Sequence, residues 1–296
     1  MSAGKLHPDE ADTDEPLVRR LLAAQFPQWA DLPVEPVGSA GTSNAMYRLG
    51  QDMVVRLPRI KGAADDVERE HHWLPRLAPA LPVAVPAPLG MGRPGSGYPW
   101  PWSVYRWLDG ECPAIGGAAE DRVPTQDLAE FVAALRRIDP AGGPSSYRSE
   151  ALAERDAMTR AAIGQLRGVI DADAATALWD AALRATAWQE PAVWIHADLQ
   201  PGNVLLAGGR LSAVIDFGCM GLGDPAVDLI AAWYLLTADA RGVFRTALDV
   251  DDAAWSRGRG WALSVALGEV SYYRETYPEK AALGRYVIAE VLSERC

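Results

Sequence analysis

The amino-acid sequence predicts an α+β fold of two lobes, a small β-rich N-terminal lobe and a larger, mainly helical C-terminal lobe. Short β-branched and aromatic runs, separated by turn residues, occupy the first third of the chain and predict strands. From Pro124 onward the apolar residues recur mainly at helical spacing. Two strand-like runs interrupt these helices, and each ends in a polar motif. We place the boundary after residue 107, which gives lobes of residues 1–107 and 108–296.

The composition is that of a globular protein without membrane spans. The chain has 296 residues, of which 49% are hydrophobic and 23% charged, as in ordinary soluble domains. No apolar run approaches the roughly 18 residues of a membrane helix. The N-terminus is polar and acidic, unlike a signal peptide, and we expect residues 1–12 to be loosely ordered. Three cysteines without a Cys-x-x-Cys pair argue against a disulfide framework or a zinc site and favour a cytoplasmic location.

The charge balance limits the class of partner. A formal net charge of −11 disfavours nucleic acid, because binding phosphates requires a basic surface. It is compatible with a cationic substrate, which an acidic protein attracts at long range, and equally with plain solubility. We therefore expect a small-molecule substrate, no nucleic-acid or membrane partner, and a monomer or weak dimer.

The N-terminal lobe contains a loop of small residues that is suited to phosphate binding. A first helix, capped by Thr13 or Asp14, precedes strands at Val34–Val37, Ala45–Leu49 and Met53–Leu57. The loop at residues 38–44 lies between the first two strands, and small residues let backbone N–H groups approach a triphosphate. Its candidate nucleotide contacts are Ser39, Thr42 and Ser43. With only Gly38 and Gly41 as glycines, the loop is also compatible with a hairpin turn.

A cation near a strand end and a Glu on the next helix predict an ion pair. Arg56 lies in the strand Met53–Leu57, and the helix predicted at Ala64–Leu77 places Glu70 on its apolar face. Glu68 lies about 160° away around that helix. In kinases a Lys–Glu pair of this kind binds the α- and β-phosphates. The alternative for Arg56 is a solvated charge at a strand end.

A hinge strand is predicted at Tyr98–Leu108, after a Pro-rich extended connection at Leu81–Pro88. In such hinges the purine of a nucleotide pairs with backbone groups, and we assign the Trp residues of the strand to the core. The helices predicted after it are Thr125–Ile138, Glu150–Ile170 and Ala172–Trp188, and helical spacing resumes from Pro225.

The segment Val193–Leu229 carries the residues that indicate the chemistry. One apolar run ends in His196-Ala197-Asp198, with Asn203 five residues after Asp198, and a second ends in Asp216-Phe217-Gly218. Phosphoryl transfer needs one carboxylate to orient or deprotonate the acceptor hydroxyl, and oxygen ligands that hold Mg²⁺ on the nucleotide. The two motifs, each behind an apolar strand, match these needs and resemble the catalytic and metal-binding loops of kinases.

With these residues placed, the chain resembles the aminoglycoside phosphotransferase family, which has the protein-kinase-like fold. The motifs that carry the resemblance are VVR, DVERE, SVYRWLDGE, HADLQPGNVLL and VIDFGCMGLGDPAVDL. The Ala-, Gly-, Arg- and Trp-rich composition suggests a bacterial source, and the resemblance implies a small-molecule kinase. It implies that Asp198 is the catalytic base, that Asn203 and Asp216 bind Mg²⁺, as two ions, and that Asp228 ties the following helix to the catalytic loop.

The resemblance also has implications for the nucleotide. Arg106 and Leu108 would offer hinge backbone groups to the purine, and Tyr105 falls at the gatekeeper position. A bulky gatekeeper is associated with guanine nucleotides in part of the family, so the expected donor is ATP or GTP. The chain departs from the family at Arg56, where Lys is usual, at Gln200, where a basic or other polar residue is common, and at Val54, where some members have an aromatic ring.

Two other classes of function compete with a small-molecule kinase. A protein kinase is disfavoured, because only residues 218–224 separate the Asp-Phe-Gly motif from the next helix, which leaves no platform for a peptide. A non-catalytic nucleotide-binding module has no positive support, since Asp198, Asn203 and Asp216 are all present.

The acceptor expected first is an aminoglycoside antibiotic, with antibiotic resistance or biosynthesis as the physiological role. A cationic amino sugar needs carboxylates and aromatic rings beside Asp198, and the candidates are Glu269, Tyr272, Tyr273 and Glu275. These residues are also compatible with a solvated helix surface. The alternative is a macrolide or another small metabolite, for which Trp233, Tyr234 and Trp255 are available as apolar contacts.

Overall fold

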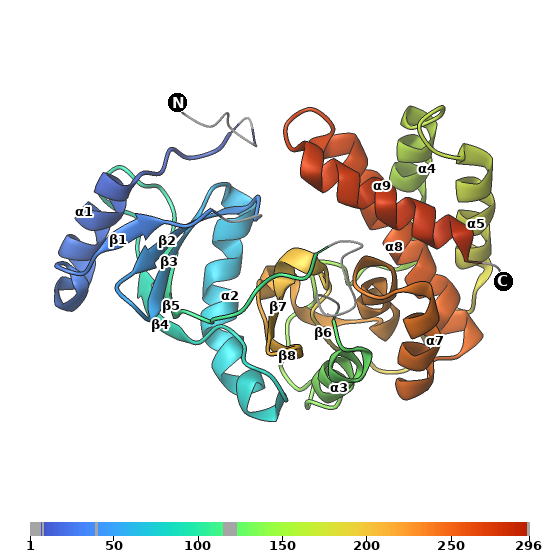
Figure 1. The fold of residues 1–296 in the computed structure, drawn as a ribbon, viewed down its shortest axis with the longest axis horizontal. Coiled ribbons are helices and arrows are strands. Elements are labelled where there is room, and N and C mark those ends of the chain that lie inside the picture. Colours follow the sequence, from blue (N-terminus) through green and yellow to red (C-terminus); the bar gives the residue numbers. More distant parts are fainter. Residues whose placement is uncertain (1–6, 8, 39–40, 115–122, 295–296) are drawn as a thin grey trace. The chain divides into compact units, whose positions relative to one another are not determined.

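The computed structural model describes residues 7, 9–38, 41–114 and 123–294, and the chain folds into two compact units (Figure 1). The first unit consists of Met1–Gly110 together with Ala213–Gly218, and the second of Glu111–Ser212 together with Cys219–Cys296. The first break, at Gly110, is three residues from the boundary expected at 107. The sequence did not indicate that Ala213–Gly218 belongs with the first unit.

The first unit is built on a five-stranded antiparallel sheet in the order β1-β2-β3-β5-β4. Its strands are β1 (Val34–Pro36), β2 (Asn44–Leu49), β3 (Met53–Pro58), β4 (Pro88–Gly92) and β5 (Trp102–Arg106). The expected pairing of β2 with β3 is confirmed, with Leu49 opposite Met53. Gly50 between them has φ 61°, a conformation that favours glycine in a tight turn.

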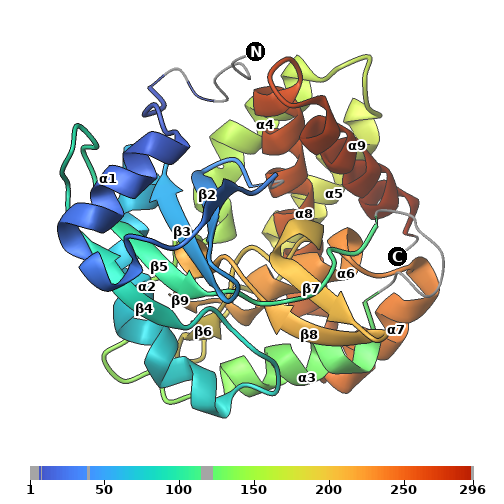
Figure 2. The ribbon, with the colours of Figure 1, turned by 60° about the vertical axis from the view of Figure 1, so that its left-hand side comes forward.

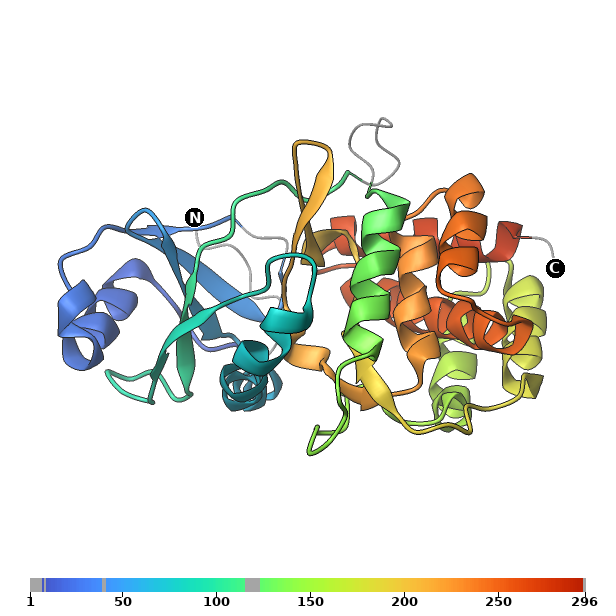
Figure 3. The same cartoon turned by 90° about the horizontal axis from the view of Figure 1, so that it is seen from below.

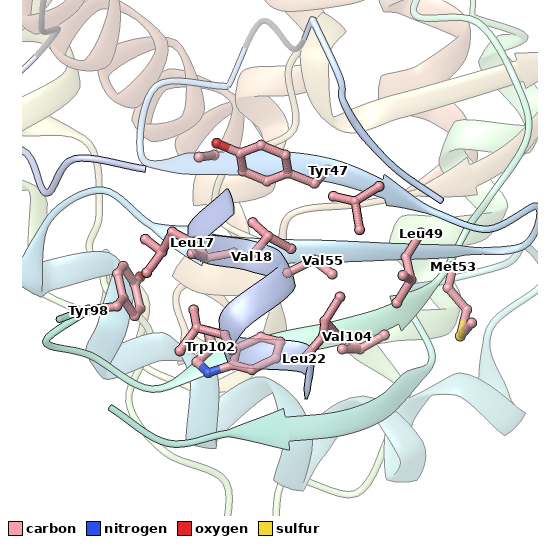
Figure 4. Close-up of a cluster of buried hydrophobic side chains, with 14 residues drawn as sticks. Leu17, Val18, Leu22, Tyr47, Leu49, Met53, Val55, Tyr98, Trp102 and Val104 are labelled. Atoms are coloured by element: carbon pink, nitrogen blue, oxygen red, sulfur yellow. The ribbon is translucent and has the colours of Figure 1, made fainter. Parts of the chain in front are cut away.

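Helices cover both faces of this sheet, so every residue of β3 is buried (Figure 2). On one face α1 (Glu15–Gln25) packs its apolar side chains against the sheet (Figure 4). Asp14 begins α1 as expected, since its Oδ1 accepts a hydrogen bond from Leu17 N at 2.7 Å. The residues of this core include Leu17, Val18, Leu22, Leu49, Val55, Trp102 and Val104.

The second face of the sheet carries polar residues. Because side chains alternate along a strand, Arg56 lies on the face opposite Val55. The register places Ser103 of β5 opposite Arg56 and Tyr105 opposite Val54. The helix α2 (Lys61–Leu77) contributes Glu70 to this face. The fold therefore brings Arg56, Glu70 and Tyr105 together before any ligand is considered.

The extended connection expected at Leu81–Pro88 is confirmed, since residues 81–87 contain no helix, but the edge strand β4 that begins at Pro88 was not foreseen. Gly90 is suited to this strand, because a Cβ there would lie 2.8 Å from the Phe26 ring. Loose order was expected for residues 1–12, of which 1–6 and 8 lie outside the described residues. Among the described ones, Ala11 N donates to Arg59 O at 2.8 Å and Glu10 pairs with Arg59.

The second unit is mainly helical, as expected, and its helices run from green (α3) to red (α9) in Figure 3. They are α3 (Thr125–Arg136), α4 (Asp156–Gln165), α5 (Ala172–Arg184), α6 (Ala231–Tyr234), α7 (Ala238–Ala247), α8 (Asp252–Tyr273) and α9 (Pro278–Ser293). The short strands β6 (Val193–Ile195) and β9 (Gly221–Gly223) pair antiparallel, and β7 (Val204–Ala207) pairs with β8 (Arg210–Val214).

The helix predicted at Glu150–Ile170 is shorter than expected. A 3₁₀ turn at Leu152–Arg155 precedes α4, which ends at Gln165. Gly168 beyond that end has φ 88°, which a helix cannot continue through. Within the described residues, none of the helices combines the length and apolarity that crossing a membrane requires.

Glycines allow α8 to pack closely with its neighbours. A Cβ at Gly258 of α8 would lie 2.6 Å from Leu229 Cβ, and a Cβ at Gly284 of α9 would lie 2.8 Å from Ala266 O. Since real Cβ atoms do not approach so closely, both positions need glycine. The close contact between α8 and α9 fixes the spacing between the side chains that the two helices present to each other.

Candidate active site

The candidate catalytic loop, which carries Asp198, begins at the end of β6, where Asp228 holds its backbone. The fully buried Asp228 carboxylate accepts hydrogen bonds from His196 N at 3.0 Å and from Ala197 N at 2.7 Å. These bonds confirm that Asp228 ties the following helical segment to the loop. Ala197 has φ 68°, a conformation that residues other than glycine seldom adopt. The two hydrogen bonds stabilise that turn and thereby fix the direction in which Asp198 leaves it.

Three side chains donate hydrogen bonds to the Asp198 carboxylate. Arg148 Nη1 lies 2.9 Å from Oδ1, while Gln200 Nε2 and Asn203 Nδ2 lie 2.6 and 2.9 Å from Oδ2. Burial disfavours the charged form, but the charges of Arg148 and Lys280 outweigh burial and lower the pKa of Asp198 to about 2. Asp198 is therefore a fixed carboxylate that is ionised at physiological pH.

The Asn203 side chain has the orientation that a cation ligand needs. Its Nδ2 donates to the Asp198 backbone oxygen at 2.8 Å and to Asp198 Oδ2 at 2.9 Å. Because these bonds use both amide hydrogens, Oδ1 faces away from Asp198. Mg²⁺ binds oxygen ligands from carboxylates and amides. The donor chemistry and the fixed amide orientation both fit the metal-binding role that the sequence suggested for Asn203.

The ion pair expected between Arg56 and Glu70 is present in the first unit. Arg56 Nη1 donates to Glu70 Oε1 at 2.8 Å and to Oε2 at 2.7 Å, and the Glu70 side chain is buried. Tyr105 donates its hydroxyl to the same Oε2 at 2.5 Å. Burial opposes the charge of Arg56, but Glu70 and Asp216 raise the pKa of its guanidinium well above the ordinary value. Glu68 is exposed, as its position on α2 predicted.

Arg56 also binds Asp216, the acidic residue of the Asp-Phe-Gly motif. Its Nη2 donates to Asp216 Oδ1 at 2.6 Å. The Asn44 amide, with its oxygen toward the guanidinium, accepts from Arg56 Nε at 3.1 Å and Nη2 at 2.9 Å. A planar guanidinium can bind several acceptors in fixed directions, whereas an ammonium is a single point charge. The Arg at this position thus connects Glu70 directly to Asp216.

The end of the Asp-Phe-Gly motif is held by α2. Arg69 Nη1 donates to Gly218 O at 3.0 Å, and a Cβ at Gly218 would lie 2.8 Å from Asp66 Oδ2. Burial raises the pKa of Asp66 to about 7, although the charge of Arg69, 3.3 Å away, opposes this shift. Within the motif Asp66–Glu70, only Glu70 could be given a role from the sequence, and the closeness of Asp66 and Arg69 to Gly218 was not foreseen.

The chain from Cys219 to Pro225 is short and closely packed in the second unit. Cys219 O accepts hydrogen bonds from Ser146 Oγ at 2.7 Å and Tyr147 N at 3.2 Å. Residues Gly221–Gly223 then form β9, which pairs with β6. A long peptide-binding segment is therefore absent between these two described positions, in agreement with the sequence.

The structure describes most of the residues expected to contact the nucleotide and shows which of their backbone groups are already hydrogen-bonded. Ser39 lies outside the described residues. Thr42 O lies 3.1 Å from His7 Nε2, and Ser43 O accepts from Arg59 N at 2.8 Å. Arg106 N donates to Ala87 O at 3.0 Å. Across the described part of the chain no acceptor meets the Leu108 N–H, the group that the family resemblance assigns to the purine.

From the sequence alone, the adjacent residues His71 and His72 are expected on the surface of their helix, but His71 is half-buried. Its Nε2 lies 3.0 Å from Ser103 Oγ, and its ring centroid lies 5.7 Å from that of Tyr105. Burial lowers the pKa of His71. Because His71 follows Glu70 on α2, it lies at the margin of the face that packs on the sheet. His72, one residue further, is exposed as expected.

The four residues proposed to contact the acceptor do not form one cluster. Glu269 is buried, and its carboxylate accepts from Lys280 Nζ at 3.0 Å and from the Tyr234 hydroxyl at 2.9 Å. Tyr272 and Glu275 are exposed, and Tyr273 packs against Tyr272 with ring centroids 4.8 Å apart. Glu269 is therefore paired inside the protein. Tyr272 and Tyr273 lie in the last turn of α8, and Glu275 follows its end.

The apolar residues considered for a macrolide belong to the core. The indole N–H groups of Trp233 and Trp255 both donate to the Glu294 carboxylate, at 2.6 and 2.9 Å. Both rings are buried. Tyr234 is also buried and bonded to Glu269. These three side chains therefore lie in the core and are not exposed to a ligand.

Two residues near Asp198 were missed by sequence analysis. Arg148 binds Asp198 from a segment 50 residues upstream, and Lys280 binds Gln200 from α9, 80 residues downstream. Neither lies in a motif. The only local signal was Gln200 itself, which departs from the family pattern and now proves to bridge Asp198 and Lys280.

The fold is of the protein-kinase-like class, with an antiparallel sheet in the first unit and helices in the second, and together with the family below it makes the chain a small-molecule kinase. The expected two-part α+β fold is thereby confirmed. The chain belongs to the phosphotransferase enzyme family, whose model matches residues 34–261.

Solved structures with this fold include phosphotransferases of two kinds. The GDP and kanamycin complex of APH(2")-IIia has a TM-score of 0.74 and 20% identity, over 93% of this chain and 97% of that chain. Macrolide 2'-phosphotransferase MphH from Brachybacterium faecium has a TM-score of 0.60 and 22% identity, over 96% and 99%. Macrolide 2'-phosphotransferase type I has a TM-score of 0.62 and 19% identity, over 93% and 97%. No curated protein sequence gave a significant match.

Proposed function

We propose that the chain transfers the γ-phosphate of ATP or GTP to a hydroxyl group of a small molecule. The observation that carries the proposal is the Asp198 carboxylate, which Arg148, Gln200 and Asn203 hold in one position. Phosphoryl transfer depends mainly on positioning and on charge stabilisation, and a carboxylate held by three donors is suited to positioning. The GDP complex of the neighbour APH(2")-IIia supports a nucleotide as the donor.

Asp198 acts chiefly by orienting the acceptor hydroxyl. A carboxylate with a pKa of about 2 is a weak base at neutral pH. It can accept a hydrogen bond from the hydroxyl and aim its oxygen at phosphorus, and it takes the proton late in the reaction. This role agrees with a loose transition state, in which the nucleophile needs little activation.

On the donor side, Arg56 is proposed to bind the α- and β-phosphates while Glu70 and Tyr105 hold it. Asn203 and Asp216 are proposed to hold Mg²⁺, as two ions, through the Asn203 amide oxygen and the Asp216 carboxylate. The bound metal supplies positive charge to the phosphate oxygens. The backbone of Arg106 and Leu108, and the loop with Ser39, Thr42 and Ser43, are proposed to contact the rest of the nucleotide.

An aminoglycoside is the acceptor we propose first. The net charge of −11 attracts a polycation, and exposed Tyr272 and Glu275 can meet an amino sugar at the end of α8. Neighbouring structures include complexes with kanamycin and with gentamicin. Tyr273 and the Asp198 carboxylate complete the proposed contacts.

A macrolide is the second candidate, and one observation favours it. Glu269 is one of the candidate carboxylates for an amino sugar, but its charge is offset by Lys280. Fewer acidic groups then remain for a molecule with several ammonium groups. Two neighbours of the same fold are macrolide 2'-phosphotransferases.

The experiment is a turnover assay of the purified chain with ATP and GTP against aminoglycosides, macrolides and simple sugars. Turnover with one class and Asp198→Asn lowering kcat by about 10²–10⁴-fold, with nucleotide KM little changed, would support the proposal. Glu68→Gln, an exposed carboxylate on α2, is the control. Mg²⁺-dependent nucleotide binding without turnover of any acceptor would favour the non-catalytic module. Near-normal turnover in Asp198→Asn would reject Asp198.

A further inference from the structure

We infer that Lys280 is a positioning residue for Asp198 and that it acts through Gln200. The inference rests on the proposed function, in which Asp198 orients the acceptor hydroxyl. Lys280 lies in the first turn of α9, 82 residues after Asp198 in the sequence. Its ammonium donates to Gln200 Oε1, and Gln200 Nε2 donates to Asp198 Oδ2 at 2.6 Å.

An amide such as Gln200 can present either its oxygen or its nitrogen to a neighbour, and the two orientations have opposite effects on a carboxylate. With Nε2 toward Asp198 the amide donates a hydrogen bond, whereas with Oε1 toward Asp198 two acceptors would repel each other. Lys280 can only donate, so it selects the orientation in which Oε1 faces α9. The amide nitrogen then has to face Asp198.

The position of Lys280 on α9 supports a functional role. A cation in the first turn of a helix opposes the helix dipole, and burial also opposes the charge, since the side chain is only 17% exposed. The ammonium is nevertheless retained, because Glu269 Oε1 lies 3.0 Å away and raises the pKa of Lys280. If packing were the only requirement at this position, an apolar side chain would meet it at lower cost.

The series of contacts from Asp198 through Gln200 to Lys280 continues into the helical core. Glu269 of α8 accepts from Lys280 with one oxygen and from the Tyr234 hydroxyl with the other, at 2.9 Å. The close packing of α8 on α9, which Gly284 permits, fixes the distance between Glu269 and Lys280. The chain of contacts from Tyr234 to Asp198 thus ties the catalytic loop to α6, α8 and α9. Arg148 holds the other carboxylate oxygen independently.

The test is a double-mutant cycle with Lys280→Met and Gln200→Ala, read on turnover with the best acceptor. Lys280→Met is expected to lower kcat about tenfold, which corresponds to about 1.4 kcal/mol, with the nucleotide KM within about twofold. If Lys280 acts through Gln200, then Lys280→Met lowers kcat less than about twofold further once Gln200→Ala is present. If the fold losses in kcat of the two single variants instead multiply in the double variant, Lys280 acts independently of Gln200, which would overturn the inference.

Two further variants control for simple loss of structure. Lys61→Met makes the same change at the exposed first residue of α2 and should leave kcat unchanged. Lys280→Arg keeps a charged donor and should retain kcat within about threefold of the parent. A loss in Lys280→Arg as deep as in Lys280→Met, at an unchanged melting temperature, would overturn the inference.

Asp198→Asn separates this inference from the proposed function. If Asp198→Asn retains turnover, the proposed role of Asp198 fails, whatever Lys280→Met shows. If Asp198→Asn abolishes turnover and Lys280→Met leaves kcat unchanged, only the role of Lys280 fails.

Discussion

The Tyr105 hydroxyl donates a hydrogen bond to Glu70 Oε2 at 2.5 Å, and the same oxygen accepts from Arg56 Nη1 at 2.7 Å. The side chain that we propose as the gatekeeper is therefore bonded to Glu70, the residue that holds the cation proposed to bind the phosphates. The bulk of a gatekeeper side chain can influence which nucleotide binds. The hydrogen bond from Tyr105 to Glu70 can influence the affinity for the nucleotide in a second way, which does not depend on the purine.

Tyr105→Phe separates these two effects, because it keeps the ring and removes the donor. We expect KM to rise by about three- to tenfold for ATP and for GTP alike, which corresponds to the loss of one ordinary hydrogen bond. Steady-state kinetics with both nucleotides measures this. A change of more than about threefold in the ratio of the two KM values would instead show that the hydroxyl contacts the purine.

Arg56→Lys tests whether charge alone is sufficient at this position. A Lys ammonium cannot bind both Glu70 oxygens, Asp216 and Asn44 as the guanidinium does. We expect kcat/KM for the nucleotide to fall by about tenfold, with the fold retained. Arg19→Lys, at an exposed pair with Glu15, is the matched control and should be neutral. Unchanged kcat/KM in Arg56→Lys would show that the contact with Asp216 is not used.

Asp228→Asn should destabilise the protein by about 1–3 kcal/mol, because one backbone N–H of the catalytic loop then faces an amide NH₂ group. Urea unfolding measures the change. Asp251→Asn provides the comparison, since Asp251 caps α8 from an exposed position and Asn caps equally well. Equal stability of the two variants would mean that the loop does not depend on Asp228.

Asp66→Asn should make stability less dependent on pH between about 4 and 7. Below that range Asp66 is protonated in the folded and the unfolded chain. Within it the unfolded carboxyl ionises near its ordinary value of 3.8, while the folded one keeps its proton up to about 7. Stability contributed by this group is therefore lost as the pH rises through the window.

The variant, which cannot ionise, should gain stability relative to the parent between pH 4 and pH 8. One unit of pKa shift corresponds to about 1.4 kcal/mol, so the gain amounts to a few kcal/mol at most. Chemical unfolding at both pH values measures it. A constant difference across the range would show that Asp66 ionises normally in the folded chain.

The sequence was sufficient for those parts of the site that depend on local pattern. Glu70 could be assigned because a helical period separates the buried face of α2 from Glu68, and the strand register around Gly50 followed from turn residues and alternation. Asp228 could be assigned through the family pattern. Each of these predictions depends only on the residues nearby in the sequence or on a family motif.

The contacts that were missed are made between side chains that lie far apart in the sequence. Arg148 and Lys280 are ordinary charged residues in ordinary contexts, and nothing near either one in the chain indicates Asp198 or Gln200 as its neighbour. The expectation for Glu269 had the same weakness, because helical spacing placed it near Tyr272 and Tyr273 but could not reveal that Lys280 and Tyr234 occupy its carboxylate. A sequence shows which residues are charged, but only the folded chain shows which opposite charges offset them.

The assignment of Ala213–Gly218 to the first unit has a consequence for how this gene can be recombined. Cutting the chain once, after Gly110, would separate Arg56 from Asp216, and would also leave Ala84 O without the Val214 N–H that lies 3.0 Å from it. A crossover between two relatives at that point would combine the guanidinium of one parent with the carboxylate of the other. Chimeras should therefore keep their activity only when both segments come from the same parent.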